Sequence, residues 1–248
     1  MTARKPTLDD TPRTVPPTPQ RNGEAGQSFV SSDLLCAGKT ILSLFDFSGN
    51  WSRPYAEAGA NVVQLDLKHG VNILDIDCAW LSENVLEPFG TVDAILAAPP
   101  CTDFAVSGAK HWHKKANESV LPGFPKQVDI SIELAKQVLR CIEYLQPDWW
   151  AVEQPVGRLH KLLPEFGKPW FWQPWWYGDP WTKKTALYGN FCRDLPRNEV
   201  TPIRHKWGSW MMRLGGKSAK TKELRSTTPE GFCRAFYAAN NWQTKKKP

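Results

Sequence analysis

The chain has 248 residues, of which 41% are hydrophobic, and this is enough for one α/β domain with a buried core. The net charge of +6 permits a polyanionic partner such as nucleic acid. No run of about 18 apolar residues is present and no secretory h-region opens the chain, so we expect no membrane partner and no export.

The six cysteines are spread over the chain and form no C-x-x-C pair. This spacing argues against a zinc site and a disulfide framework, and it is typical of free thiols in a reducing cytoplasm. We therefore expect no bound metal and a cytoplasmic location. The cysteines are Cys36, Cys78, Cys101, Cys141, Cys192 and Cys233.

The first 33 residues are rich in Pro, Thr, Arg and Gly and lack apolar periodicity. This composition predicts a disordered or loosely attached arm. Its basic residues permit contact with nucleic acid, although a solvated tail has the same composition. The folded part of the chain is expected to begin at residue 34.

The first ordered unit has the pattern strand, tight turn, helix and strand. Lys39–Phe45 is an apolar strand that runs into a turn over residues 46–52. Arg53–Ala58 is helical, and Asn61–Leu65 is a second strand that ends at Asp66. In such units the turn amides face a ligand and the acid binds ribose hydroxyls. A G-x-G-x-x-G motif is missing, so a dinucleotide is not the favoured ligand.

A third apolar segment and a helix follow the second strand. Val71–Ile76 is apolar apart from Asn72 and Asp75, and Asp75 is a further candidate for contact with a nucleoside ligand. Residues 78–88 have a helical pattern.

A proline pair and a cysteine follow the next strand. Val92–Ala98 is apolar except for Asp93, and Pro99 and Pro100 stop the strand because neither can donate to a ladder. Cys101 is therefore expected on a rigid bend at the carboxyl end of a strand, where open α/β sheets bind their ligands. A buried structural cysteine is the alternative interpretation.

The segment after Cys101 is polar and loop-like over residues 102–125. Its run 110–115 interleaves basic and aromatic side chains, which suits a nucleic-acid backbone and its bases. A long loop directly after a candidate nucleophile is also the usual place for a lid that closes on substrate.

A second reactive-type residue ends the following strand. Val128–Leu145 has the apolar period of an amphipathic helix, and Asp148–Val152 is a strand that ends at Glu153. A right-handed crossover returns the chain to the same sheet edge, so Cys101 and Glu153 are expected at one edge if their strands are parallel neighbours. A strand-end acid without a chemical role is the alternative for Glu153.

The C-terminal third contains one more strand and one more helix. Lys183–Tyr188 is a strand that begins with two cations, and residues 190–222 are irregular and basic. Thr228 is expected to cap a helix that has Pro229 in its first turn and runs to about Asn240.

A thiolate and a carboxylate beside a nucleoside-type pocket fit one reaction well. Carbon 5 of cytosine is too weak a nucleophile to accept a methyl group unaided, and a cysteine thiolate that adds to carbon 6 makes carbon 5 enamine-like. A carboxyl group that hydrogen-bonds ring N3 and the exocyclic amine supports this addition and selects cytosine. The target base must leave the double helix to be reached.

These residues resemble the motifs of the DNA cytosine-5 methyltransferase family, and most closely those of its short phage-type members. Pro99-Pro100-Cys101 matches the nucleophile motif, and Glu153-Gln154-Pro155 resembles the motif of glutamate, asparagine and valine or proline. Weaker matches are Asp46-Phe47-Ser48-Gly49, Lys183-Lys184-Thr185 and residues 224–230.

The resemblance implies a Rossmann-like SAM-dependent methyltransferase fold of the α/β class, with a mostly parallel, doubly wound sheet. It implies S-adenosyl-L-methionine as cofactor, DNA with a flipped cytosine as substrate, and a monomer in a bacterial or phage-infected host cell. The implied parts are a catalytic domain over 34–189, a small target-recognition-like region over 190–222, and a returning helix with a basic tail over 223–248. The implied catalytic residues are Cys101, Glu153, Lys183 and Lys184. The implied cofactor-binding residues are Asp46, Phe47, Ser48, Gly49, Asn50, Trp51, Asp66, Asp75, Ile76 and Pro99.

The sequence departs from the family at several positions. Trp51 stands where the family has a second loop glycine, and Gln154 replaces the usual asparagine. The region 190–222 is shorter than the recognition domain of sequence-reading members, which predicts short or low sequence specificity, or specificity borrowed from a partner. Two other interpretations stay open: the same fold with a different transferred group, RNA or a nucleotide as substrate, and an inactive DNA-binding module.

Overall fold

The computed structural model describes residues 35–117, 126–205, 208–209 and 218–243. The chain divides into two units, residues 1–32 and 33–248, and all described residues belong to the second unit. The arm expected over residues 1–33 therefore lies outside the described residues. Within the ranges given above, no helix is long and apolar enough to cross a membrane.

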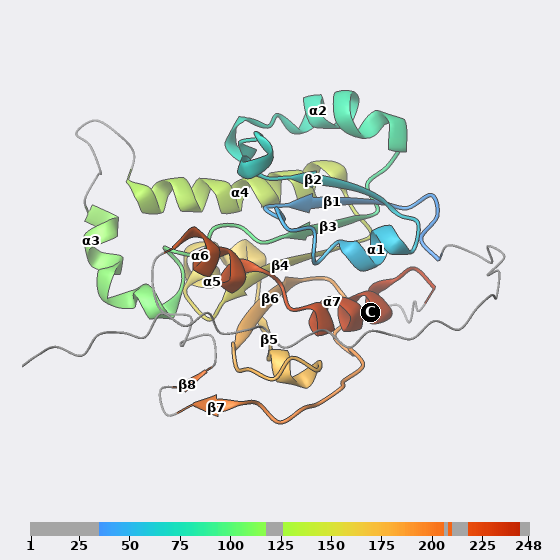
Figure 1. Ribbon diagram of the computed structural model, residues 1–248. Helices are drawn as coiled ribbons and strands as arrows, with labels where there is room; N and C mark the ends of the chain where they lie inside the picture. The colour runs from blue at the N-terminus through green and yellow to red at the C-terminus, as the bar shows by residue number, and fades with distance from the viewer. Residues whose placement is uncertain (1–34, 118–125, 206–207, 210–217, 244–248) are drawn as a thin grey trace, which may run out of the picture. The chain divides into compact units, whose positions relative to one another are not determined.

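A six-stranded sheet in the order β2-β1-β3-β4-β6-β5 forms the centre of the unit (Figure 1). Strands β2, β1, β3 and β4 are parallel, and β6 runs antiparallel to both of its neighbours. The strands are β1 (Thr40–Leu44), β2 (Asn61–Leu65), β3 (Ala94–Ala97), β4 (Trp149–Pro155), β5 (Trp170–Trp172) and β6 (Thr185–Gly189). The structure confirms the expected Rossmann-like, mostly parallel, doubly wound α/β fold.

Seven α-helices lie in the described part of the chain, joined by short 3-10 and π turns. They are α1 (Arg53–Glu57), α2 (Cys78–Leu81), α3 (Trp112–Asn117), α4 (Gln127–Leu145), α5 (Leu159–Leu162), α6 (Ala219–Ser226) and α7 (Glu230–Asn240). A separate two-stranded ribbon pairs β7 (Arg204–His205) with β8 (Gly208–Ser209).

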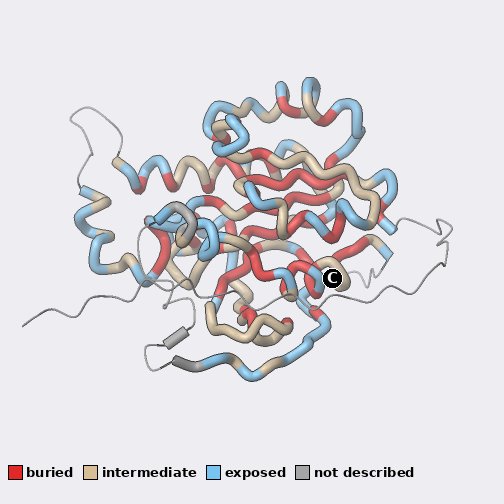
Figure 2. The backbone as a smooth tube through the Cα atoms, in the orientation of Figure 1, coloured by how far each residue is buried: buried red, intermediate tan, exposed pale blue. Residues whose placement is uncertain are grey.

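Two hydrophobic cores cover the two faces of the sheet, because successive strand side chains point to opposite faces. Leu42 and Leu44 of β1 face a core that includes Ala135 and Val138 of α4. Ile41 faces the other core, which is largely aromatic and contains side chains of α1 and α7. Buried residues accordingly follow the strands in Figure 2, and the outer helix surfaces are exposed.

Two expectations about the segments around the candidate site need correction. The stretch expected to be loop-like over residues 102–125 contains a 3-10 helix, Val106–His111, and α3 in its described part. The strand expected to end at Glu153 continues to Pro155, because residues 153–155 pair with β6.

Three expectations about the C-terminal third also need correction. The strand expected from Lys183 begins at Thr185, because Lys183 donates its backbone N–H to the side chain of Gln173 at 3.0 Å instead of pairing in the sheet. The region 190–222 is not irregular throughout, since it contains β7, β8 and the start of α6. Thr228 does not cap α7: the N-cap is Pro229, and no side chain caps the helix.

Candidate active site

A cavity of about 600 Å³ opens at the carboxyl ends of the parallel strands. The chain moves from β1 to β2 on one side and later to β3 on the other, so the loops after β1 and β3 diverge at this point. Such a switch point is where doubly wound folds bind ligands. The cavity wall includes residues of both loops, and also residues that follow β2 and residues of β4.

Cys101 lies in this wall and is exposed. The two prolines before it end β3, and its carbonyl accepts the backbone N–H groups of Phe104 and Ala105, each at 3.0 Å, which turns the chain back toward the sheet. Removal of water by the surrounding protein raises the pKa of the thiol, and the Glu153 carboxylate raises it further, whereas Lys183 lowers it. The thiol is thus accessible, and its charge responds to both neighbours.

Glu153 lines the same cavity from β4. Ala97, the last residue of β3, pairs with Val152 in the parallel register, and β4 continues past it to Pro155 with Glu153 paired to Leu187 of β6. The Glu153 side chain is 13% exposed, and desolvation raises the pKa of its carboxyl, which Lys183 partly offsets. In the part of the chain that the structure describes, no hydrogen bond reaches this carboxyl group, so its capacity to bind a ligand is unused.

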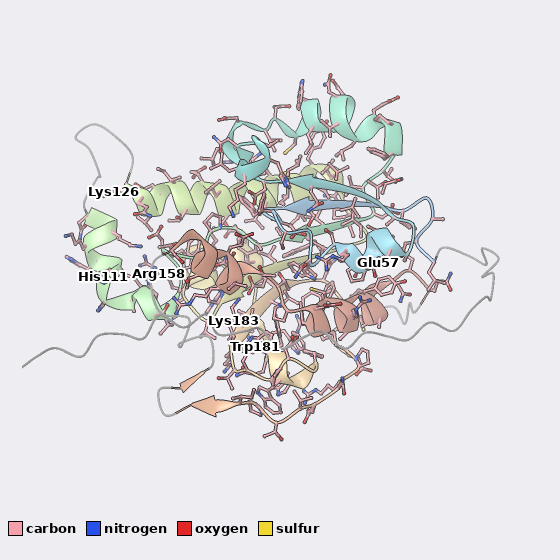
Figure 3. All side chains as sticks on the ribbon, viewed as in Figure 1. Glu57, His111, Lys126, Arg158, Trp181 and Lys183 are labelled. Carbon is pink, nitrogen blue, oxygen red and sulfur yellow. The ribbon has the colours of Figure 1, made fainter. Side chains whose placement is uncertain are left out.

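The two adjacent lysines lie in different surroundings. The Lys183 ammonium is 3.9 Å from the Glu153 carboxylate and donates to the Arg225 carbonyl at 3.1 Å, and the residue lines the cavity. The Lys184 ammonium lies 4.5 Å from the ring centre of Phe171, and the residue is exposed outside the cavity wall. Figure 3 labels Lys183 beneath α6.

The segment that carries Cys101 is bonded to β4 and to the residues that follow β4. The buried Gln154 side chain of β4 donates to the Pro99 carbonyl, so it joins β4 to the segment after β3. Further on, Val106 donates its N–H to the Val156 carbonyl at 2.9 Å. A Cβ at Gly157 would lie 2.0 Å from the Phe104 carbonyl oxygen, so only glycine permits this approach.

The turn after β1 is built around the buried carboxylate of Asp46. Ser43 and Ser52 donate their hydroxyls to one carboxylate oxygen at 2.9 and 3.0 Å. Gly49 has φ +65°, and its N–H donates to the Asp46 carbonyl at 3.2 Å. This left-handed conformation closes the turn tightly, and glycine adopts it without steric cost.

The next part of the wall presents an aromatic ring and an acid. Phe47 is 38% exposed, with its ring 5.1 Å from that of His69 and the Lys68 ammonium 4.2 Å away. Asp66 follows β2, and its carboxylate accepts the Lys68 backbone N–H at 2.8 Å, leaving its other oxygen for a ligand.

Most of the predicted site residues line this one cavity, but not all of them. Cys101, Glu153, Lys183, Asp46, Phe47, Ser48, Trp51, Asp66 and Pro99 do so. The wall does not include Gly49, Asn50, Asp75, Ile76 or Lys184. Asp75 instead accepts from the Asn72 side chain at 2.9 Å, and the Ile76 carbonyl accepts from Gln137 at 2.6 Å.

The wall also contains stretches for which the sequence predicted no site residue. They are residues 67–68, residues 72–74, two side chains of α4, and Glu223 with residues 225–228 at the end of α6 and after it. The Asn50 side chain donates to the Thr228 carbonyl at 3.2 Å and so joins the last of these stretches to the turn after β1. The only signal in the sequence is the weak motif match over residues 224–230. No group of His, Cys, Asp or Glu that suits a metal ion is found among the described residues.

No protein-family model matches the chain, and no curated protein matches it. Among solved structures, the chain is similar to a prophage-encoded E. coli protein assigned as a DNA modification methyltransferase, with 18% identity and a TM-score of 0.39 over 61% of this chain and 46% of that one. It is also similar to the Entamoeba histolytica methyltransferase EhMeth, with 13% identity and a TM-score of 0.43 over 73% and 61% of the two chains. The chain thus spans about half of the first protein and three fifths of the second. The fold assignment rests on the order and direction of its own strands.

Proposed function

We propose that the protein transfers a methyl group from S-adenosyl-L-methionine to carbon 5 of cytosine in DNA, through a covalent bond between Cys101 and carbon 6. The observation that carries the proposal is the shared cavity, which an exposed thiol and a carboxyl group without hydrogen bonds enter from adjacent parallel strands. A thiol and a neutral acid on one planar ring are what this reaction requires.

The residues of the cavity suit the proposed cofactor. A volume of about 600 Å³ lies in the range of small-molecule sites. The exposed face of Phe47 is available to stack on an adenine, and the Asp66 carboxylate at the end of β2 is available to accept ribose hydroxyls. When bound, S-adenosyl-L-methionine supplies an electrophilic methyl group.

The roles of the protein residues follow from their charges. The Cys101 thiolate adds to carbon 6, and the ring electrons move to carbon 5 and N3. Glu153, whose raised pKa favours the protonated carboxyl, donates a hydrogen bond to N3 and accepts one from the exocyclic amine. After methylation, which leaves S-adenosylhomocysteine, a water molecule takes the carbon 5 proton, and departure of the thiolate restores the aromatic ring. Lys183 stabilises the thiolate before it attacks.

A mechanism-based trap tests this proposal. The target cytosine of a DNA duplex is replaced by 5-fluorocytosine, and S-adenosyl-L-methionine is supplied. After methyl transfer, carbon 5 of this base has no proton to lose, so the thiolate cannot leave and the protein should form an adduct that resists denaturation. Cys101→Ser should form none, while Cys78→Ser, which is not in the cavity wall, should react as the wild type does. Mass spectrometry of nucleosides from treated DNA should then detect 5-methylcytosine. Detection of a different modified base would mean that the protein transfers a group other than methyl. If the wild-type protein forms no adduct, the proposal is refuted.

The short region 190–222 leads us to propose short or low sequence specificity. Bisulfite sequencing of DNA from expressing cells tests this directly. Methylated cytosines should occur in many sequence contexts or in a short one. Modification confined to one long motif would contradict this part of the proposal and leave the chemistry intact.

A further inference from the structure

Asp103, two residues after Cys101, is a fully buried carboxylate that the chemistry proposed above does not use. It accepts a hydrogen bond from the Ser131 hydroxyl of α4 at 2.6 Å. It also forms an ion pair with the Lys115 ammonium of α3 at 2.6 Å. A buried charge is costly unless it is paired, so these contacts fix the positions of both partners.

Arg158, which follows β4, also binds the segment that contains Asp103. Arg158 donates its side-chain Nε–H to the Asp103 carbonyl and its backbone N–H to the Phe104 carbonyl, both at 3.0 Å. Its guanidinium carbon lies 4.3 Å from the ring centre of Trp112 in α3. Arg158 thus packs on the side of α3 that faces the rest of the fold (Figure 3).

We propose that Asp103 is a positioning residue that locks the segment between Cys101 and α3, so that the thiol and the Glu153 carboxyl address opposite sides of one base. This inference rests on the proposed methyltransferase function. Asp103 contacts α3 and α4 through its side chain and Arg158, after β4, through its carbonyl, so it joins the segment that carries the thiol to three other parts of the fold. Lys115 further fixes the segment, because its ammonium group also donates to the Thr102 carbonyl at 3.3 Å.

The alternative is that Asp103 only stabilises the fold. The two roles predict different effects on two rates: the reaction of the Cys101 thiol with a small reagent and its reaction with a cytosine base. If Asp103 positions the thiol, its loss slows the addition to carbon 6, because this reaction requires one geometry. A misplacement of about 1 Å lowers the rate of such a step by about 100-fold. Alkylation of the thiol by iodoacetamide has no such demand. Moreover, Asp103 raises the pKa of Cys101, so its neutralisation does not make the thiol less reactive.

The experiment compares Asp103→Asn, Lys115→Met and Lys115→Arg with the wild type. Glu133→Gln, which removes an exposed charge on α4, is the control. Each variant is checked for thermal unfolding, and two rates are measured: the maximal rate of adduct formation with 5-fluorocytosine DNA at saturating DNA and S-adenosyl-L-methionine, and the rate of Cys101 alkylation. We expect Asp103→Asn and Lys115→Met to slow adduct formation by about 10- to 100-fold without slowing alkylation. Lys115→Arg should restore most of the adduct rate.

The outcomes separate the two proposals. Wild-type adduct formation together with unchanged rates in Asp103→Asn and Lys115→Met would overturn the positioning role alone. Parallel losses of adduct formation, alkylation and folded protein would assign Asp103 to stability and would also overturn it. If Asp103→Asn does not fold, Lys115→Met decides, because that side chain is partly exposed. A wild-type protein that forms no adduct would overturn the proposed function, and this inference with it.

Discussion

One lysine–carboxylate pair lies where β1 and β3 begin, and another joins β4 to the residues before β6; the two pairs differ in how many hydrogen bonds the carboxylate accepts. At the amino end, Asp93 pairs with Lys39 and accepts the Thr40 backbone N–H at 2.8 Å. At the carboxyl end, Glu153 is 3.9 Å from Lys183, and no hydrogen bond from the described residues reaches it. The first pair therefore joins β1 to the start of β3, whereas the second leaves an acid free to bind a ligand.

The two carboxylates show how an acid that stabilises the sheet differs from an acid that is available to a ligand. A desolvated carboxylate that accepts no hydrogen bond costs free energy even beside a lysine at 3.9 Å, so a fold keeps one only where another benefit offsets the cost. The raised pKa of Glu153 is the sign of that cost. Removing the charge at each end should therefore have opposite consequences.

The largest effect is expected for Glu153→Gln. The amide keeps the shape but does not supply the proton that the proposed chemistry needs, so methylation should fall by about 10²- to 10⁴-fold. Stability should not fall. Because the folded pKa is raised, Glu153 contributes stability when protonated at low pH and loses it as pH rises through the folded pKa, so the neutral amide spares this loss at pH 8. Turnover and thermal unfolding at pH 8 measure the two results, and an unfolded or fully active variant would contradict them.

The matched change at the other end, Asp93→Asn, should do the reverse. It weakens a charge-assisted hydrogen bond to Thr40 and removes the charge that faces Lys39. We expect the free energy of unfolding to fall by about 1–2 kcal/mol, with turnover of the folded protein unchanged. Chemical denaturation measures the first and initial rates measure the second. A loss of turnover without a loss of stability would show that the two ends are not independent.

The placement of Cys101 and Glu153 at the same edge of the sheet could be predicted from the sequence. Two apolar strands that each stop at a proline-containing segment predicted that Cys101 and Glu153 share an edge, and the parallel pairing of β3 with β4 confirms that edge. This prediction succeeded because a right-handed crossover has only one place to return the chain.

Other features of the candidate site depend on contacts between residues far apart in the sequence, which sequence patterns do not predict. Asn50 and Thr228 are 178 positions apart, so nothing local indicates that residues 225–228 close the cavity. Lys183 and Lys184 look equivalent in the sequence, and only the late start of β6 sends them to different surroundings. Asp103 likewise looked like an ordinary loop residue, because its partners come from α3 and α4.

The smallest effect is expected for Lys183→Gln, with Lys184→Gln as the control. Lys183 lowers the pKa of Cys101 and Glu153 raises it, so the two substitutions should move the thiol in opposite directions. The pH profile of Cys101 alkylation should shift to higher pH in Lys183→Gln, to lower pH in Glu153→Gln, and not at all in Lys184→Gln. Because a partly exposed ion pair contributes about 0.2–1 kcal/mol, turnover in Lys183→Gln should fall by no more than about 5-fold. Shifts of the same sign in the first two variants would mean that the thiol responds to a change in local structure and not to the two charges, and the contrast between the ends of the sheet would then lose its electrostatic basis.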